Sequence, residues 1–169
     1  SNEVRLETWS LLAPALGTHD LVVNLSSPVT DGAIAGVLSF ASVDQLDPLG
    51  SLVTAGNSSN SASLTTNSSN DDMVLSTIGI EYHGNYELIP GANQVELWDL
   101  SSDGLNFGAA QQNGGSSVTS TWTFDNADAW SAAALPIHAT VLANASPVIT
   151  SNGGGNVASL NVDEWDTNA

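Results

Sequence analysis

The chain has 169 residues, of which 41% are hydrophobic, and it carries 18 acidic side chains against one basic side chain, Arg5, for a formal net charge of −17. A chain with a single cation cannot neutralise a run of phosphates, which excludes nucleic-acid binding and disfavours binding to anionic membranes. The absence of Cys excludes disulfides and thiolate chemistry, and no apolar run is long enough for a membrane-inserted helix.

The polar residues are mainly Ser, Thr, Asn and Gly, and helix-favouring Lys, Arg and Glu are scarce. This composition predicts an all-β protein. A domain of about 150 residues buries roughly 70% of the surface that its unfolded chain exposes, so this length supports one sizeable core. We expect one main domain, an antiparallel β-sandwich of jelly-roll or Ig-like type.

The densest apolar patterning lies in residues 4–44, where we predict three strands at 3–12, 19–26 and 33–42. Two segments rich in turn-forming residues separate these strands. They are Ala-Pro-Ala-Leu-Gly-Thr at 13–18 and Ser-Pro-Val-Thr-Asp-Gly at 27–32. We therefore expect this stretch to supply much of the core.

The middle of the chain alternates between strand-like and loop-like composition. Residues 47–69 are rich in Ser, Asn, Thr and Gly, which predicts a loop-rich edge with a weak strand at 62–66. Apolar, β-branched runs predict strands at 72–82 and 94–100, and the Gly/Asn-rich stretch 101–116 predicts a long loop between strands.

Towards the C-terminus we predict a strand at 118–124, a turn at 125–128 and a strand at 129–142 that breaks at Pro136. A boundary follows at 144–147, and shorter strands follow at 148–150 and 157–162. The expected organisation is a β-sandwich module over 1–145 and a C-terminal extension over 146–169. The extension is too short for an independent domain, so it must pack on its own module, on a continuation of the chain or on a neighbour.

Calcium is the expected cofactor, because acidic side chains gather at predicted turns, where carboxylates and carbonyls can converge on one hard cation. The alternative for each carboxylate is a solvated acidic surface. The candidate ligands are Asp99 with Asp103, Asp125 with Asp128, and Asp163 with Glu164 and Asp166.

Five Trp residues allow two interpretations. Those at 9, 98, 122 and 130 lie on predicted strands with apolar neighbours, which favours the core. Trp9 and Trp98 would instead form a stacking platform for a polysaccharide if their rings were exposed. No GxSxG or HExxH motif occurs, so we expect no enzymatic activity and no catalytic residue.

Several blocks together resemble a β-sandwich module found in very large secreted or surface proteins of bacteria. They are WSLLAPALGTHDLVV from Trp9, GVLSFASVDQ from Gly36, STWTF from Ser120 and DAWS from Asp128, and the resemblance spans about 4–143. It implies an extracellular or cell-surface location and a structural or adhesive role.

The tail SPVITSNGGGNVASLNV from Ser146 resembles the opening strands of a cadherin-like repeat. That resemblance implies a calcium-binding Glu shortly after the strand, near Glu164, although this chain has Asp-Glu-Trp-Asp at 163–166 where such repeats have a short Ala-Glu-Asn run.

Members of the resembled family carry further strands before the block that opens this chain, which implies a sandwich with an open side. Either the chain is a piece of a longer polypeptide, or a strand from another copy or a neighbouring module fills the gap by β-augmentation. The glycines at 153–155 would serve as a hinge for such a donor strand. Its expected contact residues are Val157, Leu160, Val162 and Trp165.

Overall fold

The computed structural model describes residues 4–29, 32–81, 86–102 and 104–140, together with the backbone of two short strands at 148–150 and 159–162. All regular structure in these residues is β-strand, and the strand pairs are antiparallel. The predicted all-β, antiparallel fold class is therefore confirmed. No described segment forms a helix with the length and apolar character needed to cross a membrane.

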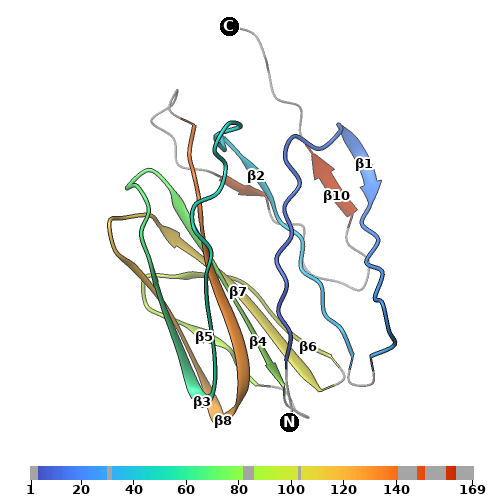
Figure 1. Ribbon diagram of the computed structural model, residues 1–169, viewed down its shortest axis with the longest axis vertical. Helices are drawn as coiled ribbons and strands as arrows, with labels where there is room; N and C mark the ends of the chain where they lie inside the picture. The colour runs from blue at the N-terminus through green and yellow to red at the C-terminus, as the bar shows by residue number, and fades with distance from the viewer. Residues whose placement is uncertain are drawn as a thin grey trace, which may run out of the picture.

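A six-stranded open sheet forms the body of the molecule, at the lower left of Figure 1. Its strand order is β3, β8, β4, β7 and β6, and the short β5 pairs with β8 outside that path. The strands are β3 (Val53–Thr66), β4 (Met73–Glu81), β5 (Ile89–Pro90), β6 (Val95–Ser102), β7 (Leu105–Asn113) and β8 (Val118–Ile137).

The longest strand, β8, folds back over the sheet. In the β4–β8 ladder Ser76 lies opposite Ala134, yet the side chain of Ser76 also accepts a 2.6 Å hydrogen bond from Trp122, twelve residues earlier in β8. Twelve residues of straight strand would span about 40 Å. Both contacts are possible only because β8 bends sharply between them, and Figure 1 shows β3 and β8 curving together at the lower end of the sheet.

The bend is marked by a register shift, where β3 advances from Ser59 to Ser61 while β8 moves from Asp128 to Thr123. The core lies between the two halves of the bent strands, an arrangement consistent with a β-sandwich. Its fully buried members include Trp122, Ile78, Ile80, Leu88 and Val74. Each side chain of this size contributes roughly 1.5–3 kcal/mol through burial.

The described residues 4–29 and 32–41 make three passes beside the sheet (Figure 1). We call 4–12 the first pass, 19–26 the second and 33–41 the third, and the predicted turn at 13–18 lies between the first two. Within the described part of this stretch the regular structure is two short strands. β1 (Gly17–Asp20) pairs with β10 (Ser159–Val162), and β2 (Ser39–Ala41) pairs with β9 (Val148–Thr150). The predicted strands at 3–12, 19–26 and 33–42 are wrong over most of their described length, because the chain there has no ladder partner among the residues that the structure describes.

Two predicted loops are strands. Residues 101–116 contain β7, whose small residues are required by packing, because a Cβ on Gly108 would lie 3.0 Å from both Leu88 Cδ1 and Trp122 Cζ3. Residues 47–69 contain β3, which is polar because it lies at the sheet edge with many exposed side chains.

The predicted turn at 125–128 and the predicted break at Pro136 are also wrong, since β8 is continuous through both. The turn-forming residues 125–128 lie at the bend of β8. Pro136 fits because it has no N–H to pair, while its carbonyl accepts a 2.9 Å hydrogen bond from Gly50 N.

Candidate assembly surface

The N-terminal layer, which we define as residues 4–29 and 32–41, exposes many large hydrophobic side chains. Nine of them in the stretch 4–29 are between 47% and 86% exposed. The prediction that this stretch supplies the core is therefore wrong. The nine are Trp9, Leu11, Leu12, Leu16, Leu21, Val22, Val23, Leu25 and Val29.

The backbone of this layer is largely unpaired. Among hydrogen bonds that join two described residues, no backbone–backbone bond involves residues 4–16, 21–29 or 32–38. Apart from carbonyls that accept from side chains, such as that of Val4, the amides and carbonyls of these segments have no backbone partner among the described residues and are available to water or to another chain. Unpaired backbone combined with exposed apolar side chains is what a strand presents before it joins a sheet.

The first pass nevertheless has the side-chain alternation of a strand. Val4 and Leu6 are half-buried, whereas Arg5, Glu7 and Trp9 are exposed. The exposed three also contact one another, since Arg5 forms an ion pair with Glu7, and Trp9 Nε1 donates a 3.2 Å hydrogen bond to Glu7. Contacts between residues two apart require an extended chain.

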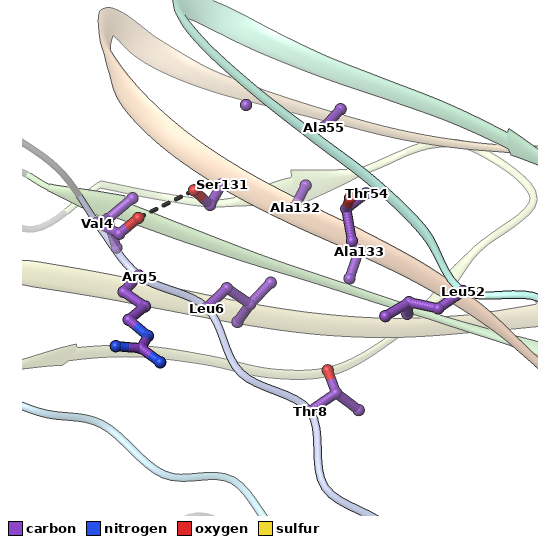
Figure 2. Close-up of a pocket in the computed structure, with 11 residues that line it drawn as sticks. Val4, Arg5, Leu6, Thr8, Leu52, Thr54, Ala55, Ser131, Ala132 and Ala133 are labelled. Carbon is purple, nitrogen blue, oxygen red and sulfur yellow. Dashed lines mark hydrogen bonds between the residues drawn. The ribbon is translucent and has the colours of Figure 1, made fainter. Parts of the chain in front are cut away.

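One end of the first pass is attached to the sheet. Ser131 Oγ donates a 2.9 Å hydrogen bond to the carbonyl of Val4, and Val4 packs on Gly79, where a Cβ would lie 3.2 Å from Val4 Cγ2. Beside this attachment lies a groove of about 620 Å³ between the pass and the sheet. Figure 2 shows Leu6 and Thr8 from the pass on one side of the groove, and Thr54 and Ala133 from β3 and β8 on the other.

The third pass covers Trp98. A Cβ on Gly36 would overlap the Trp98 indole ring, and Phe107 flanks that ring at a centroid distance of 5.9 Å. Trp98 is buried and its Nε1 has no hydrogen-bond partner among the described residues. Trp9 is 86% exposed. The structure therefore does not bring Trp9 and Trp98 together as a pair of exposed rings.

Trp122 and Trp130 are buried, as expected of core residues. Their indole N–H groups have partners: Trp122 donates to Ser76 Oγ and Trp130 donates to Ser59 Oγ at 2.9 Å. Two of the four strand Trp residues therefore help to hold the bent β3–β8 pair in place.

The described candidate calcium ligands lie on different parts of the sheet. Asp99 is on β6 and accepts a 2.9 Å hydrogen bond from Leu88 N, while Asp125 and Asp128 are at the bend of β8. Burial raises the pKa of Asp99, and the charge of Glu87 raises it further, against the lowering effect of the Leu88 hydrogen bond. In the described parts of the chain no three His, Asp or Glu side chains form a group able to hold a metal. Asp103, Asp163, Glu164 and Asp166 lie outside the described residues.

Two of the four predicted contact residues lie on β10, where Leu160 is opposite His19 and Val162 is opposite Gly17 of β1. Val157 and Trp165 lie outside the described residues. The strand predicted as a donor therefore pairs with the N-terminal layer of its own chain. The backbone of the layer at 17–20 thus forms an antiparallel ladder with a strand of the same chain.

Comparison of the chain with protein-family models, with curated proteins and with solved structures finds no match. The case for function consequently rests on the geometry above. The sequence identifies the apolar stretch 4–44, but it does not identify β3 as an edge strand over its full length, because Ser, Thr and Asn are also typical of loops. The Thr residues and the alternation of Ala62 and Leu64 are the features that indicate a strand.

Proposed function

We propose that this chain is a non-enzymatic structural module of an extracellular assembly, and that strands from a partner complete its N-terminal layer. The observation that carries the proposal is the coincidence, in residues 4–29, of nine exposed large hydrophobic side chains with a backbone that, outside β1, has no backbone partner among the described residues. Adding a strand there satisfies the backbone groups and buries apolar surface in one event.

Charge also favours association through this layer. Residues 4–29 contain only two of the 18 acidic side chains, Glu7 and Asp20, and they contain the single Arg. A partner that approaches the layer meets little of the repulsion that a net charge of −17 otherwise creates. Depletion of charge at the centre of a contact surface is typical of protein interfaces.

The proposed setting is the bacterial cell surface or a filament attached to it. The absence of Cys and the Ser/Thr/Asn-rich acidic surface suit such a location, and the resemblance of several sequence blocks to surface-protein modules supports it. Calcium is the proposed cofactor of the assembly, because its binding would reduce the repulsion between carboxylates.

Light scattering after size-exclusion chromatography, with electron microscopy of the same fractions, tests the proposal. We expect the wild-type mass to rise with concentration and the mass of a Leu11→Ser/Val22→Ser variant not to grow beyond that of a dimer. Leu46→Ser is the matched control, because Leu46 is 98% exposed and lies outside the layer. A wild-type monomer at every concentration, or equal assembly of the double variant, contradicts the proposal.

Carbohydrate binding is the second candidate, and it rests on Trp9, the Trp that the described residues leave exposed. One ring can stack on one sugar face. Titration of soluble polysaccharide against Trp fluorescence tests it, and a response that persists in Trp9→Ala contradicts it.

A further inference from the structure

β3 forms one edge of the six-stranded sheet over its full 14 residues. Its strand partner in the described structure is β8, and no backbone bond outside the ladders involves β3 there. Among the described residues, one side of the strand therefore presents a row of backbone donors and acceptors without a strand partner, although Ser58 N donates to Asn57 Oδ1 and Ser61 O accepts from Ser59 Oγ. Such an edge is a template for pairing with another strand.

The two edges of the sheet differ in charge. β6, at the opposite edge, carries Glu96 and Asp99, and its register with β7 shifts between Glu96 and Trp98. Charges and bulges of this kind discourage edge-to-edge pairing. β3 carries no charged residue and no Pro, in a chain that has 18 acidic side chains. The sequence therefore protects one edge and leaves the other able to pair.

We propose that the first half of β3, residues 53–59, pairs antiparallel with the same segment of a second copy, so that two sheets become continuous across a two-fold axis. This inference rests on the proposed function, since it names a second contact of the same assembly. The segment ends at the register shift after Ser59, where the bend begins. A second copy is the occupant because identical antiparallel edges are self-complementary, and because an uncharged edge lets two strongly acidic molecules meet.

The side chains of this segment allow close approach. Thr54, Gly56 and Ser58 alternate with Val53 and Ala55, which pack against the core. Two copies joined by β3 would still have their N-terminal layers free for the contact proposed above. A molecule with two separate contact surfaces forms open chains rather than closed dimers. The β3 contact would therefore produce linear growth of the assembly.

Single Cys substitutions test the symmetry of this contact, since the chain has no Cys of its own. In a two-fold antiparallel ladder a residue faces its own copy only near the axis. When 53–59 pairs with itself the axis lies at Gly56, so Thr54 of one copy faces Ser58 of the other. We therefore expect an equimolar mixture of Thr54→Cys and Ser58→Cys to form disulfide-linked dimers at several times the yield of Val95→Cys on β6. Val95 is the control because it is 59% exposed on the opposite edge. Yields on β3 no higher than at Val95 overturn the inference.

Asn57→Asp tests the same contact without a cross-link. The substitution keeps the shape of the side chain and its hydrogen bond with Ser58 N, but places two carboxylates close together across the proposed axis. We expect about a tenfold or larger increase in the dissociation constant of this contact, partly reversed by high salt. Asn93→Asp is the control, because it adds the same charge at an exposed site just before β6. It should have little effect on the dissociation constant of the β3 contact.

The two variants distinguish failure of the N-terminal contact from failure of the β3 contact. If Asn57→Asp assembles like wild type while Leu11→Ser/Val22→Ser does not, the β3 contact is overturned and the N-terminal contact stands. If Asn57→Asp arrests growth at dimers and the double variant also arrests at dimers, both contacts are supported. If the double variant assembles fully, the proposed function fails irrespective of the result for Asn57→Asp.

Discussion

Trp122 Nε1 donates a 2.6 Å hydrogen bond to Ser76 Oγ in the interior of the protein. Ser76 is 1% exposed, and its neighbour across the β4–β8 ladder is Ala134, from the other half of the strand that carries Trp122. This one serine therefore contacts both halves of β8. The hydrogen bond holds the bent strand closed over the core.

Ser76→Ala should destabilise the fold by about 1–3 kcal/mol, because it leaves the buried Trp122 N–H without its acceptor. Urea unfolding followed by Trp fluorescence measures the change. Ser63→Ala, on the exposed face of β3, is the control and should stay within about 0.5 kcal/mol of wild type. Equal stability of the two variants would show that the bend does not depend on this bond.

Gly108→Ala should also destabilise the protein, by about 1–3 kcal/mol, since the added methyl would crowd Leu88 and Trp122 at 3.0 Å. Gly115→Ala is the control, because its Cβ would have no neighbour closer than 3.5 Å. Thermal melts of the two variants make the comparison. A Gly108→Ala protein as stable as Gly115→Ala would contradict close packing of Gly108 against Leu88 and Trp122.

Asp99 should make the fold less stable as the pH rises. Burial, with the nearby charge of Glu87, raises the pKa of Asp99 in the folded protein above its ordinary value of 3.8. The folded state therefore holds the proton more tightly than the unfolded state, so stability is lost as the pH rises from 3.8 through the folded-state pKa. Asp99→Asn removes this loss and still accepts from Leu88 N.

The stability of Asp99→Asn relative to wild type should thus be greater at pH 7 than at pH 3.5. Melting temperatures at the two pH values measure the difference, and the other acidic groups cancel because both proteins contain them. A relative stability that does not change with pH would contradict the assignment of a raised pKa to Asp99.

Calcium should raise the melting temperature by more than NaCl at the same ionic strength. Any salt weakens the repulsion expected from a net charge of −17, but only a bound divalent cation gives an additional increase. Adding EDTA to the calcium sample should remove that additional increase. If CaCl2 and NaCl give the same melting temperature, the proposed calcium sites are absent.

Two strands rich in apolar and β-branched residues were predictable from sequence. The predicted strands 72–82 and 94–100 correspond to Met73–Glu81 and Val95–Ser102, because apolar and β-branched residues identify such strands without reference to their neighbours. β7 was missed because Gly108 must be small to accommodate Leu88 and Trp122. That reason lies in the tertiary structure, and no local pattern reveals it.

In the N-terminal layer a strand was predicted that the structure does not contain. The alternation of Val4 and Leu6 with Arg5, Glu7 and Trp9 predicted a strand, and the structure keeps the alternation but has no strand there. Pairing depends on which chain segments are present to form the ladder. The sequence therefore predicted the chemistry of the N-terminal layer but not its exposure.

Hydrogen exchange of the backbone amides in residues 4–29, measured by mass spectrometry in dilute and in assembled protein, tests the central claim most directly. Amides of β4 (Met73–Glu81) serve as the internal standard and should be protected in both samples. We predict rapid exchange of most amides in 4–29 in the dilute monomer and slow exchange in the assembly. Protection in the dilute monomer, or rapid exchange in both samples, would contradict the account.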